Sequence, residues 1–338
     1  MTAMTTAATV KMATMATTAA TGKSCWVLCD GRIGITNEVI GLAEAVGLPF
    51  EVKNLKPRAP WRWLPAALWP RTFAPLDRQS DPIAPPWPDL LIGAGGRTAG
   101  VAAQIRRQAK GKTFTVHLQD PRIALGNFDL VVPPWHDRVS GPNVIESVGA
   151  LHRVTADKTA AGGAALAPRI AHLPRPRVAV LIGGSNGSYR LDETEAGAIA
   201  SRLAALATQT GCGLLVTFSR RTGRKAEAAF RAALGPASAL IWDGEGENPY
   251  FGFLGTADFI LATIDSVAMV SEALSTGKPV YSLDLPGHND RINAFHARLR
   301  KEGLIRPFAG RLEIWTYQPL NDTGMVAAEI RRRLGLAS

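Results

Sequence analysis

Short apolar runs alternate along this chain with longer stretches in which apolar residues recur at helical spacing. The runs are about five residues long, which is typical of buried strands, and the stretches between them are typical of helices. In the first half we predict strands at residues 25–29, 50–52, 89–93, 113–117 and 128–132. Helices are predicted near residues 37–46 and 97–109. Strands and helices that alternate in this way predict a parallel sheet covered by helices.

The same alternation begins again in the second half of the chain. Strands are predicted at residues 177–182, 213–217, 239–242, 258–262 and 279–283. Helices are predicted near residues 193–208, 222–234 and 322–334, and one more begins near Val267. The predicted fold class is therefore α/β, with two doubly wound, Rossmann-like parallel sheets that face each other across a cleft. Ligands of such sheets bind outside the carboxyl ends of the strands, so the cleft is where we expect the site.

Composition divides the chain into five segments. Residues 1–22 are almost all Met, Thr and Ala. They lack the compact apolar stretch of a signal peptide and the arginines of a transit peptide, so we interpret them as a disordered leader or a mis-set start codon. Residues 156–176 are rich in Ala, Gly and Pro and are interpreted as a linker. This leaves an N-terminal domain at residues 24–155, a C-terminal domain at residues 177–320 and a closing helix within residues 321–338.

Length and composition indicate a soluble globular protein of two domains. The chain has 338 residues, of which 46% are hydrophobic and 20% are charged. No apolar run approaches the roughly 20 residues that a membrane-spanning helix needs. Cys25, Cys29 and Cys212 have no metal-ligand spacing and are expected to be small buried residues in a reducing cytoplasm.

The net charge of +10 favours anionic partners. Such partners are nucleotide phosphates, an acidic membrane surface or nucleic acid. Nucleic acid is not expected, because the chain has no zinc-finger spacing, no RNP-type aromatic motif and no long lysine run.

A glycine-rich turn, Gly-Gly-Ser-Asn-Gly at residues 183–187, follows the first predicted strand of the second half. Glycine lacks the Cβ that would block close approach, so successive backbone N–H groups can converge on a phosphate. Serine and asparagine add uncharged side-chain donors. The alternative is a tight turn between a strand and a helix with no ligand. The residues assigned to phosphate binding are Gly183, Gly184, Ser185 and Asn186.

A second turn follows the strand at residues 258–262. Asp265 or Ser266 is placed to cap the helix that begins near Val267. Glu272 lies further along this helix and either accepts two ribose hydroxyls or is a solvated helix residue. Together the two turns predict a nucleotide that is held at both ends.

Positive charge close to these turns indicates how a diphosphate would be neutralised. Arg220 and Arg221 suit the leaving group of a transfer reaction. Because the chain contains no Asp-X-Asp, a metal-bridged diphosphate is disfavoured, and we expect no metal and no other cofactor. His288 is placed either to reach the donor sugar or diphosphate or to be a surface-loop residue. Residues 248–250 either border the base pocket or only begin a helix.

The order of these motifs resembles the donor half of GT-B glycosyltransferases. The turn at residues 183–187 is followed by Asp265 and Ser266, by Glu272 and by Gly-Lys-Pro at residues 277–279. The nearest likeness is to the peptidoglycan transferase that moves N-acetylglucosamine onto a lipid-linked acceptor. The resemblance implies that Glu272 contacts the ribose and that the first turn contacts the diphosphate. The residues of that turn to which the role falls are Gly184, Ser185 and Asn186.

From about Ser24 onward the whole chain resembles a second group, the bacterial relatives of the plant "elongated mitochondria" fission factor. The motifs that carry this resemblance are residues 30–34 with Asn37, 93–98, 119–122, 183–187 and 217–222. The resemblance implies a GT-B-like fold. It implies no particular reaction, because the biochemical activity of that family is poorly defined.

The N-terminal half is expected to hold the acceptor, and an inverting transfer needs a base for the proton of the acceptor hydroxyl. The peptidoglycan transferase supplies a histidine from the corresponding turn, and this chain has none there. Asp30 and Asp120, at the ends of two predicted strands, are the candidate catalytic residues. Either carboxylate can instead cap its turn or pair with Arg32 or Arg122.

Residues 56–71 contain Trp61, Trp63 and Trp69 among four basic residues and no acidic ones. Tryptophan beside arginine suits a membrane headgroup interface or a lipid-linked acceptor. The alternative is a proline-rich loop that packs its tryptophans on the domain.

Together these features lead to one hypothesis for the function and two alternatives. The first is a metal-independent glycosyltransferase, in the cytoplasm at the inner face of the membrane, that moves a sugar from a nucleotide diphosphate to a lipid-linked acceptor. The second is a non-catalytic adaptor that acts through membrane or protein contacts. The third is a nucleotide-sugar 2-epimerase, which has the same architecture.

Overall fold

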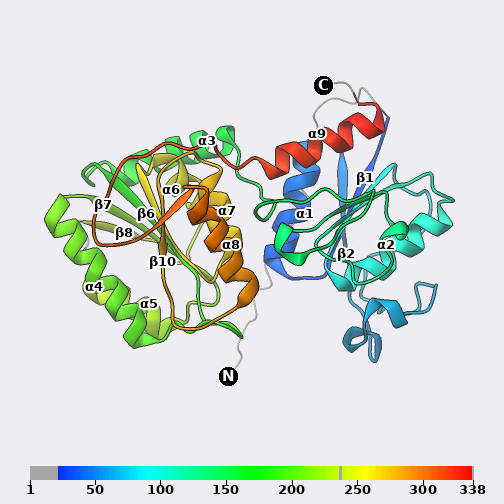
Figure 1. The fold of residues 1–338 in the computed structure, drawn as a ribbon, viewed down its shortest axis with the longest axis horizontal. Coiled ribbons are helices and arrows are strands. Elements are labelled where there is room, and N and C mark those ends of the chain that lie inside the picture. The colour runs from blue at the N-terminus through cyan, green and yellow to red at the C-terminus, as the bar shows by residue number, and fades with distance from the viewer. Residues whose placement is uncertain (1–21, 236–237, 337–338) are drawn as a thin grey trace. The chain divides into compact units, whose positions relative to one another are not determined.

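The computed structural model describes residues 22–235 and 238–336, and the expected leader lies outside them except for Gly22. The chain divides into two compact units (Figure 1). Unit 1 contains the residues up to Pro133, Val139–Glu146 and the residues from Gly324 onward. Unit 2 contains Pro134–Arg138 and Ser147–Thr323.

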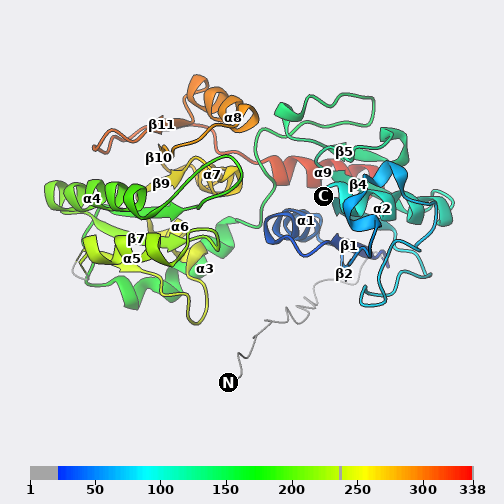
Figure 2. The ribbon, with the colours of Figure 1, turned by 90° about the horizontal axis from the view of Figure 1, so that it is seen from below.

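Unit 1 is built on one parallel sheet with the strand order β2-β1-β3-β4-β5. Its central strands are continuous apolar runs that are buried on both faces, as parallel sheets require. Helices α1 and α2 cover opposite faces of this sheet (Figure 2). The strands are β1 (Cys25–Cys29), β2 (Phe50–Asn54), β3 (Leu90–Ala94), β4 (Phe114–Leu118) and β5 (Leu130–Val132). The helical segments are α1 (Ile33–Val46), η1 (Trp61–Trp63), η2 (Ala66–Leu68), α2 (Gly96–Gln108) and η3 (Leu125–Asn127).

Unit 2 is built on a second parallel sheet with the order β11-β10-β9-β6-β7-β8. The strands are β6 (Arg177–Ile182), β7 (Gly213–Phe218), β8 (Ala239–Ile241), β9 (Phe259–Thr263), β10 (Val280–Leu283) and β11 (Ile305–Pro307). The α-helices are α3 (Ala156–Leu166), α4 (Glu193–Thr210), α5 (Arg224–Ala233), α6 (Tyr250–Thr256), α7 (Val267–Leu274) and α8 (Asp290–Lys301). Short helices η4 (Trp135–Asp137) and η5 (Ala167–Ile170) belong to the same unit, and α9 (Asp322–Leu334) begins in it and continues in unit 1.

The core of unit 2 has two layers because successive side chains of β6 point to opposite faces of the sheet. Val178, Val180 and Ile182 pack with α4 and α5 on one face. Ala179 and Leu181 pack with α3, α6 and α7 on the other. The predicted strands are all present, and β11, which is only three residues long, is the strand that the sequence pattern missed.

The segment that composition indicated as a linker contains α3 and η5. Its glycines do not make the chain flexible; they allow α3 to pack closely on α6. A Cβ on Gly162 would lie 2.7 Å from the backbone nitrogen of Gly252, and a Cβ on Gly255 would lie 2.2 Å from the carbonyl oxygen of Thr159. The glycine content of residues 156–176 was therefore wrongly interpreted as a sign of a linker, because Gly162 allows α3 and α6 to pack closely.

Among the described residues, no helix has the length and apolarity to cross a bilayer. The cysteines are buried and unpaired, as expected. Cys25 lies on β1, and burial raises the pKa of its thiol far above the ordinary range.

Two glycine-to-alanine variants test the α3–α6 contact. Gly197→Ala on α4 meets no atom within 4 Å, so we expect the free energy of unfolding to rise by about 0.5–1 kcal/mol through helix propensity. Gly162→Ala has the same propensity gain but must push α6 away, so we expect a net loss of about 1–3 kcal/mol. Urea denaturation measures both, and equal stabilisation would contradict the close contact.

Candidate functional site

The glycine-rich turn after β6 and the turn after β9 lie side by side at the carboxyl edge of the unit 2 sheet. Strands β6 and β9 are neighbours, but the chain runs from β6 toward β8 on one side and from β9 toward β11 on the other. Ligands of open α/β sheets bind at such a switch point in strand order. The predicted pairing of the two turns is therefore present, and it places the candidate donor site within unit 2.

The buried carboxylate of Asp265 is the centre of this edge. Its Oδ1 accepts a hydrogen bond from Thr263 Oγ1 at 2.7 Å, and its Oδ2 accepts one from the Gly184 N–H at 3.1 Å. Arg221 Nη2 lies 2.8 Å from the same Oδ2. The Asp265 side chain has no exposed surface, whereas that of Arg221 is 42% exposed. A buried charge needs such partners, and here they come from β9 and from the turns after β6 and β7.

This carboxylate explains the first of the two glycines after β6, and the backbone of Arg221 explains the second. A Cβ on Gly183 would lie 2.1 Å from Asp265 Oδ1, and a Cβ on Gly184 would lie 2.2 Å from the carbonyl carbon of Arg221. The N–H of Gly183 donates to Thr263 Oγ1 at 2.7 Å. Of the four residues that the sequence assigned to phosphate, Gly183 and Gly184 thus have their backbone N–H groups bound within the protein.

The remaining side chains of the first turn also bind locally. Ser185 Oγ accepts from the Leu191 N–H at 2.9 Å and donates to the Leu191 carbonyl at 3.2 Å. Asn186 Oδ1 accepts from two following backbone N–H groups, the nearer at 2.7 Å. Within the described ranges, the N–H groups of Ser185 and Gly187 have no hydrogen-bond acceptor. These two N–H groups and the exposed side-chain nitrogen of Asn186, which also has no acceptor in the described residues, are the donors available to an anion.

The two arginines after β7 have different surroundings. Arg221 is engaged with Asp265, and its N–H donates to Ser219 Oγ at 3.1 Å. Arg220 is exposed and makes no hydrogen bond or ion pair with any part of the chain that the structure describes. Arg220 is therefore the guanidinium of this pair that is available to a ligand.

His288 lies on the loop after β10. This loop pairs with the residues that follow the glycine-rich turn, through a bridge between Gly287 and Tyr189. The His288 N–H donates to the Ser188 carbonyl at 3.0 Å. Its side chain is 71% exposed, with Nε2 at 2.7 Å from Asp290 Oδ1 and Nδ1 accepting from Asn293 Nδ2 at 2.9 Å. These contacts match the surface-loop alternative.

Helix α7 begins at the second turn, with Ser266 rather than Asp265 as its N-cap. Ser266 Oγ accepts from the Met269 N–H at 3.4 Å. Further along α7, Glu272 Oε2 accepts a hydrogen bond from the Tyr250 hydroxyl. Burial raises the pKa of Glu272 to about 7. Its carboxyl group is therefore only about half ionised at neutral pH.

Tyr250 is the first residue of α6, and a lysine holds the other end of that helix. Lys278 Nζ donates to the carbonyl oxygens of Leu254 and Gly255 at 2.5 and 2.7 Å. Burial lowers the pKa of Lys278 to about 8. Helix α6 is thus bound at its start by Glu272 of α7 and at its end by Lys278, which follows α7 in the chain. These two contacts position Tyr250 against Glu272.

Sequence reasoning missed the role of His296. This residue is buried on α8, and its Nε2–H donates to the carbonyl of Ile264 at 2.9 Å, directly before Asp265. Burial lowers the pKa of His296, so the imidazole stays neutral. Its helical spacing to Ile292 and Leu299, both in apolar clusters, was the available signal.

In unit 1, both candidate bases make local bonds. Asp30 Oδ2 lies 2.7 Å from Arg32 Nε and its Oδ1 accepts from the Arg32 N–H at 3.2 Å. Asp120 Oδ1 accepts from the Arg122 N–H at 2.8 Å. Each carboxylate thus binds a nearby arginine residue in its own turn, which is the alternative to a role as catalytic base.

Among the described residues, no three His, Cys, Asp or Glu side chains gather where they could hold a metal ion.

The family assignment rests on comparison of the whole chain. The family model described as "Mitochondrial fission ELM1" matches residues 33–334. The chain belongs to the mitochondrial fission ELM1 family. This confirms the resemblance that the motifs after the strands indicated.

Two relatives of this ELM1-family chain differ in how much they share with it. It is 34% identical to the mitochondrial fission protein ELM1 of Arabidopsis thaliana over 276 residues, which are 73% of this chain but 64% of the plant protein. The chain thus spans less than two thirds of that relative. It is 28% identical to the uncharacterized protein RP120 of Rickettsia prowazekii over 90% of this chain and 97% of that protein.

Solved structures show the fold. The UDP-GlcNAc 2-epimerase of Methanocaldococcus jannaschii, in complex with UDP-GlcNAc and UDP, aligns over 92% of the ELM1-family chain and 99% of its own with a TM-score of 0.52. Sequence identity is 12%, so the likeness concerns the fold alone. The α/β, GT-B-like fold class is confirmed.

A double-mutant cycle tests the packing of the glycine turn against Asp265. Gly183→Ala alone must displace the carboxylate, and Asp265→Ala alone leaves Arg221 without its partner; we expect each to lower the free energy of unfolding by about 2–4 kcal/mol. In the Asp265→Ala background the added methyl group has room, so Gly183→Ala should cost at least about 1 kcal/mol less there. Urea denaturation measures the cycle, and simple additivity would contradict it.

Proposed function

We propose that this chain binds a nucleotide diphosphate sugar at the switch point of unit 2 and is a metal-independent glycosyltransferase. The observation that carries the proposal is the adjacency of the two turns, with Glu272 further along the helix that starts at the second. Glu272 lies five residues after Val267, which corresponds to about 8 Å of helix rise. That spacing suits a ligand with a diphosphate at the turns and a ribose at Glu272.

The proposed contacts follow from the groups that remain available. The diphosphate is bound by the N–H groups of Ser185 and Gly187, by Arg220 and by the N-terminus of α7, which carries partial positive charge. Arg221 takes part indirectly, because it neutralises the buried carboxylate of Asp265 beneath the turn. The ribose hydroxyls take the place of the Tyr250 hydroxyl on Glu272.

The proposed sugar transfer requires that the negative charge on the leaving nucleotide be stabilised. Transfer breaks the bond between the anomeric carbon and the β-phosphate oxygen, and the nucleotide departs with an added negative charge. Arg220 and the α7 N-terminus stabilise that charge without a metal ion. The acceptor, which we propose to be lipid-linked, loses its hydroxyl proton to a base, for which Asp30 and Asp120 remain the candidates.

The choice of nucleotide is guided by the fold. The epimerase with the same fold was solved with UDP-GlcNAc and UDP, which supports uracil nucleotides as the first ligands to test. Glu272 and Tyr250 support a ribonucleotide, because a carboxylate binds a pair of ribose hydroxyls.

Nucleotide binding is tested by thermal unfolding with UDP, GDP, ADP and their sugars. We expect one nucleotide, at a hundred times its dissociation constant, to add about 2.7 kcal/mol of stability. Glu272→Ala should lose this effect, whereas Glu193→Ala, a matched carboxylate change at the exposed start of α4, should keep it. The absence of stabilisation by any nucleotide would overturn the proposal.

Ionisation of Glu272 gives the same experiment a pH dependence. Because its pKa in the unliganded protein is about 7, the carboxylate form increases roughly tenfold from pH 6 to pH 8. Affinity for the nucleotide should increase by the same factor beyond any change in Glu272→Gln, in which the nucleotide and the other protein groups still titrate but residue 272 does not. Equal pH dependence in both proteins would remove the ribose role from Glu272.

Turnover separates the transferase from the two alternatives. Release of the nucleotide with transfer of the sugar is the expected result. Conversion of the sugar at C2 would identify an epimerase, and stabilisation without turnover would identify a non-catalytic adaptor.

A further inference from the structure

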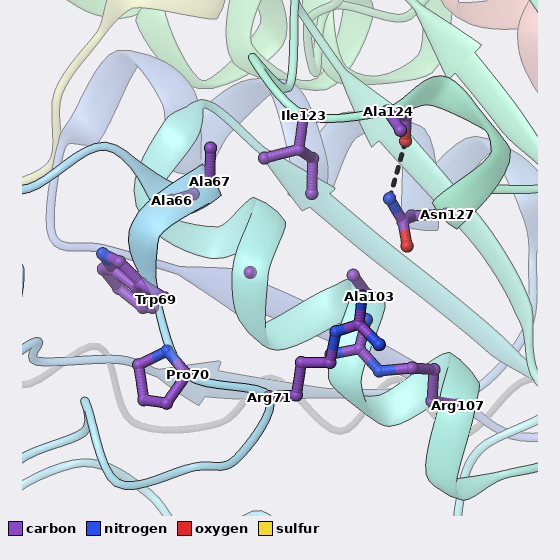
Figure 3. A pocket seen from close by; sticks show the side chains of 11 residues that line it. Ala66, Ala67, Trp69, Pro70, Arg71, Ala103, Arg107, Ile123, Ala124 and Asn127 are labelled. Carbon is purple, nitrogen blue, oxygen red and sulfur yellow. Dashed lines mark hydrogen bonds between the residues drawn. The ribbon is translucent and has the colours of Figure 1, made fainter.

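Unit 1 contains a cavity of about 240 Å³ that is separate from the residues assigned above. It lies between η2, α2 and the loop before η3 (Figure 3). Its walls combine polar and apolar surface in about equal parts, and the apolar part includes Ala66, Trp69, Ala103 and Ile123. The volume suits a small headgroup or a short chain segment rather than a whole cofactor.

Two arginines, Arg71 and Arg107, line the same cavity (Figure 3). Arg107 Nη2 donates at 2.6 Å to the neutral side-chain oxygen of Gln104. Burial and the charge of Arg71 lower the pKa of Arg107. Within residues 22–235 and 238–336 neither guanidinium is in an ion pair. Both arginines are exposed to solvent. They lie close enough for the charge of one to lower the pKa of the other, and an anion that accepts from both would offset this repulsion.

Residues 56–71, which contain the three tryptophans, form one side of this cavity. Some of their side chains pack inward on the domain and others face solvent, and we call these the inner and outer parts of the segment. Trp69 packs inward, with its ring 3.2 Å from where a Cβ on Gly100 of α2 would lie. Its indole N–H donates to the Leu64 carbonyl at 3.2 Å. Trp63 and Leu68 face solvent, with 68% and 62% of their surfaces exposed. Trp69 therefore packs on the domain, as the second alternative for the tryptophans has it, whereas Trp63 is exposed.

The outer part is also basic. Residues 55–74 contain Lys56, Arg58, Arg62 and Arg71 and no acidic residue. The Arg62 guanidinium lies 4.2 Å from the centre of the Trp63 ring. Exposed tryptophan and leucine beside arginine is the combination that lies at the headgroup level of a bilayer.

We propose that this cavity receives the phosphate headgroup of an anionic phospholipid, while Trp63 and Leu68 enter the surface of the bilayer. Arg71 and Arg107 bind the phosphate from two sides, and the apolar wall contacts the first carbons of the lipid. This binding site lies in unit 1 and does not depend on the donor site proposed for unit 2.

Vesicle co-sedimentation of the full chain tests the proposal. The protein should bind phosphatidylcholine vesicles that contain phosphatidylglycerol and should not bind pure phosphatidylcholine. Arg71→Gln with Arg107→Gln should weaken binding roughly 30-fold, as expected for two basic residues at an anionic surface. The matched pair Lys225→Gln with Lys301→Gln removes the same charge from exposed sites in unit 2 and should change binding less than the arginine pair.

A second variant pair and a soluble anion distinguish a lipid site from a site for free phosphate. Trp63→Ala with Leu68→Ala keeps both arginines and should also weaken vesicle binding at least roughly fivefold, because the apolar contact with the bilayer is lost. Absence of binding to the phosphatidylglycerol vesicles, or equal losses in the arginine and lysine pairs, would overturn the proposal. Thermal stabilisation by inorganic phosphate that requires the two arginines, without vesicle binding, would assign the cavity to free phosphate and would overturn the lipid source.

Discussion

One buried carboxylate organises the carboxyl edge of the unit 2 sheet. Asp265 follows β9, and its oxygens accept hydrogen bonds from the end of β9, from the turn after β6 and from an arginine after β7. A buried charge is tolerated only with such a set of partners. The identities of Thr263, Gly183 and Arg221 follow from this requirement, since each donates to the carboxylate or leaves room for it.

This constraint changes how the glycine turn is understood. The N–H groups of Gly183 and Gly184 donate to side chains after β9 and at its end. The backbone N–H groups that remain available to a ligand are those of Ser185 and Gly187. Arg221 balances the negative charge of Asp265, so that a diphosphate above the turn does not face an uncompensated carboxylate. Glu272, whose pKa burial raises to about 7, accepts a hydrogen bond from Tyr250, and in the proposed complex ribose hydroxyls take the place of Tyr250.

The fold was predictable because its central strands contain fully buried apolar runs, such as residues 25–29 and 178–182, which the pattern located directly. Glycine was the main source of error. Spacing alone does not reveal whether a glycine frees the chain, admits a ligand or makes room for a side chain about 80 positions away, as Gly183 does for Asp265. The same limit hid the contact of His296 with Ile264. Such pairings depend on tertiary packing, which no local pattern contains.

Hydrogen–deuterium exchange in the presence of saturating UDP tests the central claim most directly, because it locates the nucleotide without assuming turnover. We expect slower exchange in peptides that cover residues 183–191 and 265–275, where the free N–H donors and the start of α7 lie. Exchange in the peptide covering residues 66–71 of unit 1 should stay unchanged. Slower exchange confined to unit 1, or none in the two turns at saturation, would contradict a donor site at the switch point of unit 2.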